Sequence, residues 1–200
     1  MLAICVPVRD TVTASFSYSL AQLTAYLSHH NIEFGLYYES GSILPEQRNK
    51  LVTTALNNNA DEILWLDSDM IFPASTYHKL ASHNKHIVGC NYGTRTKPYR
   101  TVAFTDVKDY SKTLQETTGL HSVKSLGMGC MLVDIGVYKD LPKPWYYFEY
   151  VREHDTMMGE DVAFGNNARQ HGYETFVDCD TSHLVQHTGQ LNVKLTDAIK

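Results

Sequence analysis

The chain has 200 residues, of which 43% are hydrophobic and 20% are charged, and its formal net charge at pH 7 is −5. This length and composition predict one globular domain, and the negative charge excludes a generic binder of polyanions. No apolar run approaches the roughly 20 residues of a membrane helix, and the start of the chain lacks the basic residues of a signal peptide. We therefore expect a cytoplasmic protein without membrane association, in which the four widely spaced cysteines are free, mostly buried thiols.

The first half of the chain shows alternating strand and helix patterns. Short apolar runs predict the strands, and apolar residues at every third or fourth position predict the helices. Such alternation is typical of a mostly parallel sheet that binds ligands at the carboxyl ends of its strands. The predicted strands are residues 2–8, 32–38, 63–66 and 87–90, and the predicted helices are residues 15–28, 45–57 and 73–83.

The second half has a less regular pattern. Residues 110–121 are polar and predict a hairpin or a surface excursion. Residues 142–150 are rich in aromatic side chains, which suit either core packing or stacking against a sugar or a base. Gly159 and Gly172 bound a short predicted helix at residues 161–171. Further strands are predicted at residues 101–107, 131–133 and 175–177.

Two aspartates, Asp67 and Asp69, follow the third predicted strand. Side chains at i and i+2 on an extended backbone point the same way, so we expect both carboxylates to converge just beyond the sheet edge. Like charges repel there unless a cation lies between them. The pair therefore predicts a divalent cation with phosphate oxygens on its far side. The alternative is that the pair caps a helix or fills a turn.

Three further motifs carry candidate chemistry. Glu160 and Asp161 open a predicted helix, where an acid is either a general base or simply favoured by the helix dipole. His183 and His187 have a spacing compatible with a metal site, although ordinary polar histidines share it. Arg48 lies near the start of the second predicted helix and is either a clamp for phosphate or a solvated residue.

Together these motifs resemble the glycosyltransferases of the GT-A fold. The Asp67-x-Asp69 pair is unspecific alone, and its order relative to the later motifs is what carries the resemblance. This similarity implies a Rossmann-like α/β domain over residues 1–200, with a mixed, mainly parallel central sheet flanked by helices. In chain order, the matching runs are Val6-Pro7-Val8-Arg9-Asp10, Arg48-Asn49-x-Leu51-Val52, Leu66-Asp67-Ser68-Asp69-Met70, Gly127-Met128-Gly129-Cys130, Gly159-Glu160-Asp161-Val162-Ala163-Phe164 and His187-x-Gly189.

The resemblance also implies a role for each motif. Asp69 and His187 would bind Mn²⁺ or Mg²⁺, and Asp67 would hold the donor or contact the same metal, which would stabilise the departing diphosphate. Asp161, with Glu160 as the alternative, would deprotonate the acceptor hydroxyl in an inverting enzyme; retaining members share this scaffold. Residues 1–90 would bind the nucleotide, and residues 91–200 would supply the acceptor and catalytic part. Contacts to the nucleotide sugar would come from Arg9, Asp10, Arg48, Asp67, Gly127 and Gly129.

The sequence thus predicts a metal-dependent transfer of sugar from a nucleoside-diphosphate sugar, with UDP favoured because it is the commonest donor nucleotide in this family. The acceptor hydroxyl would belong to a hydroxymethylated base of phage DNA, in the host cytoplasm, or to a glycan or small molecule. Other classes remain open: a metal-dependent nucleotidyltransferase or phosphohydrolase, and a non-catalytic binding module. The DNA hypothesis also draws on basic residues that otherwise form a solvated surface: Lys85, Arg95, Lys97, Arg100, Lys108, Lys112 and Lys124.

Overall fold

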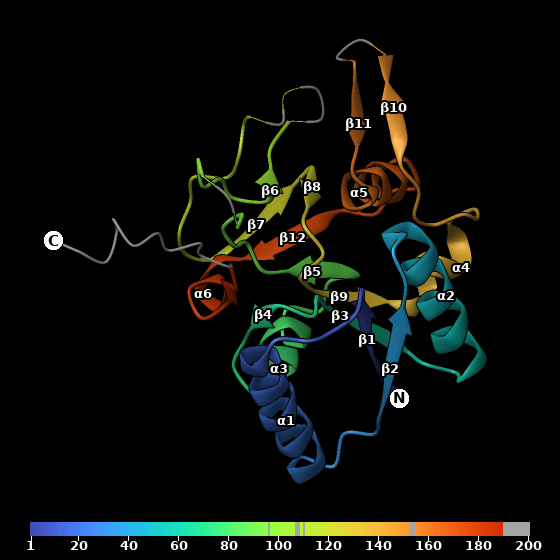
Figure 1. Ribbon diagram of the computed structural model, residues 1–200, viewed down its shortest axis with the longest axis vertical. Helices are drawn as coiled ribbons and strands as arrows, with labels where there is room; N and C mark the ends of the chain where they lie inside the picture. The colour runs from blue at the N-terminus through green and yellow to red at the C-terminus, as the bar shows by residue number, and fades with distance from the viewer. Residues whose placement is uncertain (96, 107–108, 110, 153–154, 190–200) are drawn as a thin grey trace, which may run out of the picture.

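The computed structural model in Figure 1 describes residues 1–95, 97–106, 109, 111–152 and 155–189. At its centre is a seven-stranded sheet. In spatial order its strands are β2 (Phe34–Ser40), β1 (Leu2–Val8), β3 (Glu62–Leu66), β9 (Cys130–Asp134), β5 (Ile87–Gly89), β12 (Thr175–Asp178) and β7 (Leu120–Val123). Because β9 and β7 pair antiparallel with their neighbours while the other pairings are parallel, five strands run one way and two the other. The predicted mixed, mainly parallel sheet is therefore confirmed.

Strand β1 shows how the sheet is buried between two layers. All seven of its residues are buried, and successive side chains point to opposite faces. Its even-numbered residues belong to the core cluster that contains the inner side of α1 (Ala14–His29). Ala3 and Cys5 belong to the cluster that contains the inner side of α2 (Leu44–Asn57). A strand that is apolar on both faces is typical of a sheet covered by helices on both sides.

Helices cover both faces of the sheet, as Figure 1 shows. Buried residues of α1 and α3 (Thr76–Ala81) share one core cluster, and those of α2, α4 (Ile135–Asp140) and α5 (Glu160–Gln170) share the other. The helices predicted at residues 15–28, 45–57 and 161–171 are confirmed to within one residue, whereas the helix predicted at residues 73–83 is shorter. The helix predicted at residues 161–171 is α5, and the one predicted at residues 73–83 is α3. A further short helix, α6 (Cys179–Ser182), follows β12.

The second half of the chain differs most from the sequence predictions. The strand predicted at residues 101–107 is only β6 (Ala103–Phe104), which pairs with β8 (Ser125–Leu126). Residue 107 of this prediction lies outside the described residues, as does residue 110 of the segment predicted at residues 110–121. The strand predicted at residues 131–133 lies within β9, which runs antiparallel between β3 and β5. The residues of β9 do not predict its position or its antiparallel direction in the sheet, because pairing with distant strands sets both. The other short pairs are β4 (Met70–Ile71) with β13 (Gln186–His187), and β10 (Glu149–Val151) with β11 (Thr156–Met158).

The aromatic segment at residues 142–150 is divided between core and surface. Trp145 and Tyr146 are buried, whereas half of Phe148 is exposed. The hydroxyl of Tyr146 lies 2.6 Å from that of Tyr138, which in turn accepts a hydrogen bond from the buried indole of Trp65 at 2.8 Å. The core interpretation is therefore correct for the first part of the segment.

The sequence expectations about cysteines and membrane segments can be compared with the structure. Each of the four cysteines, all within the described residues, is a free and buried thiol. None of the helices in the described parts of the chain combines the length and the apolar character needed to cross a membrane. The division into a nucleotide-binding half at residues 1–90 and a second half at residues 91–200 stays a prediction, and the central sheet takes strands from both.

Candidate active site

The carboxyl ends of β1 and β3 border a cavity of about 360 Å³. An adjoining cavity of about 410 Å³ shares four lining residues with it and also includes Asp10. Both therefore lie at the sheet edge at which the sequence predicts ligand binding. The polar and charged residues that line the first cavity are Arg9, Ser42, Gln47, Asp67, Ser68, Asp69, Arg95 and His187.

Arg48 lies behind this cavity and is 1% exposed. Its Nη2 donates to Asp67 Oδ1 at 2.9 Å, and its Nε donates to Glu160 Oε1 at 3.3 Å. The guanidinium carbon also lies 5.2 Å from the centre of the Trp65 ring. Burial opposes the charge of Arg48, but the two carboxylates outweigh burial and raise its pKa above the usual value. The interpretation of Arg48 as a solvated residue is therefore wrong. Its Nη2 and Nε donate to carboxylates of the protein, whereas its Nη1 is buried without a hydrogen-bond partner among the described residues.

Asp67 and Asp69 both line the cavity, but their carboxylates do not converge on one shared point as expected. The two residues lie in a turn after β3, in which the N–H of Met70 donates to the carbonyl of Asp67 at 3.1 Å. In a turn, side chains at i and i+2 need not share a direction. Asp67 accordingly faces Arg48, whereas Asp69 Oδ2 accepts from Arg95 Nη1 at 2.7 Å. The error came from extending the strand geometry past Leu66, where β3 ends.

The predicted pairing of Asp69 with His187 does form. Nε2 of His187 lies 3.4 Å from Oδ1 of Asp69. The two-stranded pairing of β4 with β13 sets this contact, because it places His187 opposite Met70, and the N–H of Thr188 donates to the carbonyl of Asp69 at 2.9 Å. Burial raises the pKa of Asp69, but His187 and Arg95 outweigh it and hold that pKa below its usual value.

A divalent cation fits part of the predicted ligand set. Asp69 and His187 offer one carboxylate and one imidazole side by side, a donor pair that suits Mn²⁺ when phosphate and water complete the shell. Asp67 is directed to Arg48, so the structure does not group the three predicted ligands. Throughout the described ranges, no cluster of three or more His, Cys, Asp or Glu side chains is arranged to hold a metal ion. Any bound cation would therefore take most of its ligands from a substrate.

Glu160 and Asp161 are neighbours in sequence with different surroundings. Gly159 caps α5, and both acids lie in its first turn. Glu160 is buried and paired with Arg48. Asp161 has no such cation: burial, and then the charge of Glu160, raise its pKa to about 6, against the lowering effects of the Val162 N–H and of Arg48. A carboxyl group with a pKa near neutrality can accept and release a proton under ordinary conditions.

The remaining predicted contacts are spread over the site. Arg9 and Asp10 are exposed at the end of β1 and form an ion pair of 3.5 Å with each other. Gly127 and Gly129 are buried, and a Cβ at either position would lie within 2.8 Å of the hydroxyl oxygen of Tyr92. Glycine at these positions therefore permits close approach of a protein side chain. A contact of these four residues with a nucleotide sugar stays a prediction.

The sequence interpretation missed the contacts of several residues that shape the site, although Asn49 belongs to one of the matching runs. Tyr92 accepts a hydrogen bond from the N–H of Gly129 at 2.8 Å. Gln47 donates to the carbonyls at the ends of β1 and β2, at 2.6 and 2.7 Å. Asn49 accepts hydrogen bonds from the N–H groups of Trp145 and Tyr146, at 3.0 and 3.2 Å, and so joins α2 to the aromatic segment. These contacts depend on the tertiary fold, and no local pattern in the sequence marks them.

Comparisons with known proteins give a fold but no family. No protein-family model matches the chain, and no curated protein matches it. The crystal structure of A197 from STIV aligns with a TM-score of 0.56 and 14% identity, over 96% of this chain and 97% of that one. This alignment, with the strand order of the sheet, shows the shared α/β fold.

Glycosyltransferase structures align less closely. One that is involved in glycosylation of the major capsid of PBCV-1 has a TM-score of 0.38 and 15% identity, over 72% of this chain and 69% of that one. TarS from S. aureus has a TM-score of 0.48 and 13% identity, over 94% of this chain and 60% of that one. An active-site mutant of LgtC has a TM-score of 0.46 and 10% identity, over 89% of this chain and 72% of that one.

Replacing the buried arginine tests its structural role. Arg48→Met would leave the carboxylates of Asp67 and Glu160 without their shared counter-charge, so we expect the free energy of unfolding in urea to fall by about 3–5 kcal/mol. Lys50→Met, on the same helix, removes an exposed ion pair with Glu39, and the free energy of unfolding should change far less than in Arg48→Met because solvent screens such a pair. Equal losses in the two variants would contradict the central role of Arg48.

Proposed function

We propose that this chain is a glycosyltransferase that moves a sugar from a nucleoside-diphosphate sugar to a hydroxyl acceptor with the help of a divalent cation. The observation that carries the proposal is the division of acidic groups at one sheet edge. Asp69 lies beside His187 at the cavity, whereas Asp161, which is near enough to the cavity-lining Asp67 to be affected by its charge, has a pKa raised to about 6. One acid is thus suited to a cation and the other to a proton. The order of the motifs in the sequence supports the same assignment.

The charges around the cavity suit a diphosphate. Asp69 and His187 would hold Mn²⁺ or Mg²⁺, which supplies Lewis-acid stabilisation of the departing diphosphate. Arg9 and Arg95 line the same cavity and add cationic groups that can pair with phosphate oxygens. UDP is the favoured nucleotide on the sequence resemblance alone.

The proton-accepting role is assigned to Asp161. Glu160 is the weaker candidate because Arg48 already occupies its carboxylate. In an inverting transfer, Asp161 would take the proton of the acceptor hydroxyl as that oxygen bonds to the anomeric carbon and the bond from that carbon to the diphosphate breaks. Ionised Asp67 contributes to the raised pKa of Asp161, so the two carboxylates are close enough to interact.

A sugar or small-molecule acceptor fits better than DNA. Two of the basic residues behind the DNA hypothesis have other places in the structure, because Arg95 lines the cavity proposed for the diphosphate and Lys112 pairs with Asp106. Lys108 lies outside the described residues. Binding to duplex DNA that falls steeply with salt concentration would restore the DNA hypothesis.

A panel of nucleotide sugars tests the proposed function directly. The melting temperature of the protein should rise with one donor class, and only when Mn²⁺ or Mg²⁺ is present, because a ligand that binds the native state stabilises it. Mass spectrometry of a reaction with that donor and a panel of sugars should then find the sugar attached to an acceptor. Release of phosphate or pyrophosphate would instead indicate a phosphohydrolase or nucleotidyltransferase. Donor binding without any product would indicate a binding module.

Replacement of the proposed base should have opposite effects on activity and stability. The folded-state pKa of Asp161 is raised to about 6, so its ionised form costs stability, and that cost grows as pH rises from about 4 to about 6 and is fully present above. Asp161→Asn should therefore abolish transfer yet increase the free energy of unfolding at pH 8 by up to about 3 kcal/mol, because one pKa unit corresponds to about 1.4 kcal/mol. The stability difference should vanish near pH 4.

The control for this experiment is Asp180→Asn, which alters an exposed aspartate in the first turn of α6. It should change neither transfer nor the pH dependence of stability. Wild-type kcat/KM should rise with pH through about 6, as the base loses its proton. An Asp161→Asn variant that still transfers sugar would rule out this residue as the base.

Removal of Arg95 tests the proposed cation site without any measurement of activity. Arg95 is 58% exposed, and its guanidinium occupies the second oxygen of Asp69. Arg95→Ala should therefore tighten the binding of Mn²⁺ alone about two- to fivefold, the effect of an exposed ion pair of about 0.5–1 kcal/mol. Titration calorimetry measures this affinity. Lys97→Ala, in the same exposed loop, is the control. If Arg95→Ala binds Mn²⁺ no better than the wild type, Arg95 does not compete with the cation for Asp69.

A further inference from the structure

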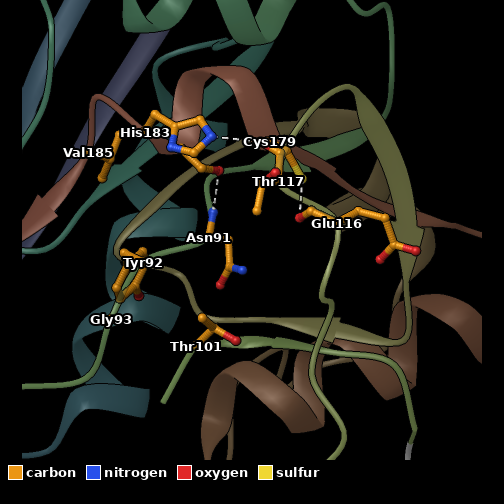
Figure 2. Close-up of a pocket in the computed structure, with 10 residues that line it drawn as sticks. Asn91, Tyr92, Gly93, Thr101, Glu116, Thr117, Cys179, His183 and Val185 are labelled. Atoms are coloured by element: carbon orange, nitrogen blue, oxygen red, sulfur yellow. Dashed lines mark hydrogen bonds between the residues drawn. The ribbon is translucent and has the colours of Figure 1, made fainter. Parts of the chain in front are cut away.

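Apart from the two adjoining cavities of the candidate active site, a separate cavity lies next to that site and has no part in the proposed function. We call it the second cavity. It encloses about 240 Å³ and is bordered by residues 91–93, Thr101, residues 116–117 and the region of α6. Figure 2 shows these segments around one open space. Tyr92 belongs to its wall, and the Tyr92 ring contacts the ring of His187 with centres 5.4 Å apart. This ring contact links the wall of this cavity to that of the candidate active site, which His187 lines.

Hydrogen bonds between distant segments hold the walls of this cavity in place. The N–H of Asn91 donates to Ser182 Oγ at 2.8 Å. His183 Nε2 lies 2.7 Å from the carbonyl oxygen of Thr117, and Cys179 Sγ donates to the carbonyl of Glu116 at 3.4 Å. Figure 2 marks all three contacts. They join α6 to two other parts of the chain, so the shape of the cavity is fixed before any ligand binds.

The cavity presents polar groups that suit a hydroxyl-bearing ligand. Within the described part of the chain, Oγ1 of Thr101 is buried without a hydrogen-bond partner. A buried hydroxyl that is left unpaired is unfavourable, and a ligand could satisfy it. The side-chain oxygen of Asn91 accepts from the N–H of Val102 at 3.0 Å, and Figure 2 shows the Asn91 amide directed into the open space. The site thus combines a hydroxyl, an amide and the aromatic Tyr92.

The charge of the cavity argues against a phosphate ligand. Its lining, as far as the structure describes it, contains no lysine or arginine, and Glu116 is its acidic residue. A neighbouring groove of about 550 Å³ shares Asn91, Thr101, Glu116 and Thr117, and it adds Arg100 and Tyr99, whose side chain is 60% exposed. Aromatic rings beside amides and hydroxyls can contact both the apolar face and the hydroxyl groups of a sugar.

We infer that this second cavity binds a neutral sugar unit at a site separate from the candidate active site. Thr101 and Asn91 contact its hydroxyl groups. The proposed function requires no such site, so this inference stands or falls independently of it.

Saturation-transfer NMR with free monosaccharides tests this site, with glucose, galactose, mannose and N-acetylglucosamine as the probes. At least one should bind the wild type, and saturating UDP with Mn²⁺ should leave that signal in place. Thr101→Val keeps the shape of the side chain and removes the unpaired hydroxyl, so it should raise the melting temperature of the free protein yet weaken sugar binding about five- to tenfold. This pair of opposite effects would not arise from simple damage to the fold.

Two further variants complete the experiment. Thr117→Val alters an exposed residue of the cavity wall and should weaken binding less than Thr101→Val, and it tests the site even when Thr101→Val fails to fold. Thr118→Val, one position along and outside the lining, should bind sugar as the wild type does. The inference is overturned if none of the four sugars binds the wild type, if UDP with Mn²⁺ abolishes the signal, or if all three variants bind equally well.

Discussion

The buried guanidinium of Arg48 holds the candidate site together. It links helix α2, the turn after β3 and the first turn of α5 through two carboxylates. A buried charge is tolerated only with partners in good geometry, and loss of one partner leaves the others uncompensated. The Trp65 ring packs against the same guanidinium. The position of Asp67 at the cavity and that of Glu160 at the start of α5 therefore both depend on their ion pairs with Arg48.

The same ion pairs explain how neighbouring acids can differ in chemistry. Three carboxylates act on the charge of Arg48, and two of them, Asp67 and Glu160, pair with it directly. Asp161 is the third: it is largely removed from water and remains near the charge of Glu160, which is why its pKa rises. Adjacent acids that lie in different surroundings are a recurring basis for assigning separate roles.

Much of the fold could be predicted from the sequence because its signals are local. The apolar run of β1 and the periodic apolar residues of α1 and α2 predict their own secondary structure, and the alternation of these elements predicts a mainly parallel sheet. The place of β9 between β3 and β5 and the burial of Arg48 depend on contacts between distant segments. The directions of Asp67 and Asp69 were predicted wrongly because β3 ends at Leu66, whereas the extrapolation continued its extended geometry to Asp69. His187 was paired correctly with Asp69, but only the resemblance linked two residues 118 positions apart.

The pairing of β13 with β4 that brings His187 to Asp69 is two residues long on each side. So short a pairing holds few hydrogen bonds, whereas the central sheet is buried on both faces and opens only when the whole domain unfolds. The contact between His187 and Asp69 is therefore governed by a local opening equilibrium that is independent of global unfolding. A ligand bound across the two residues would shift that equilibrium, so occupancy of the cavity and order in the segment at residues 186–189 would rise together.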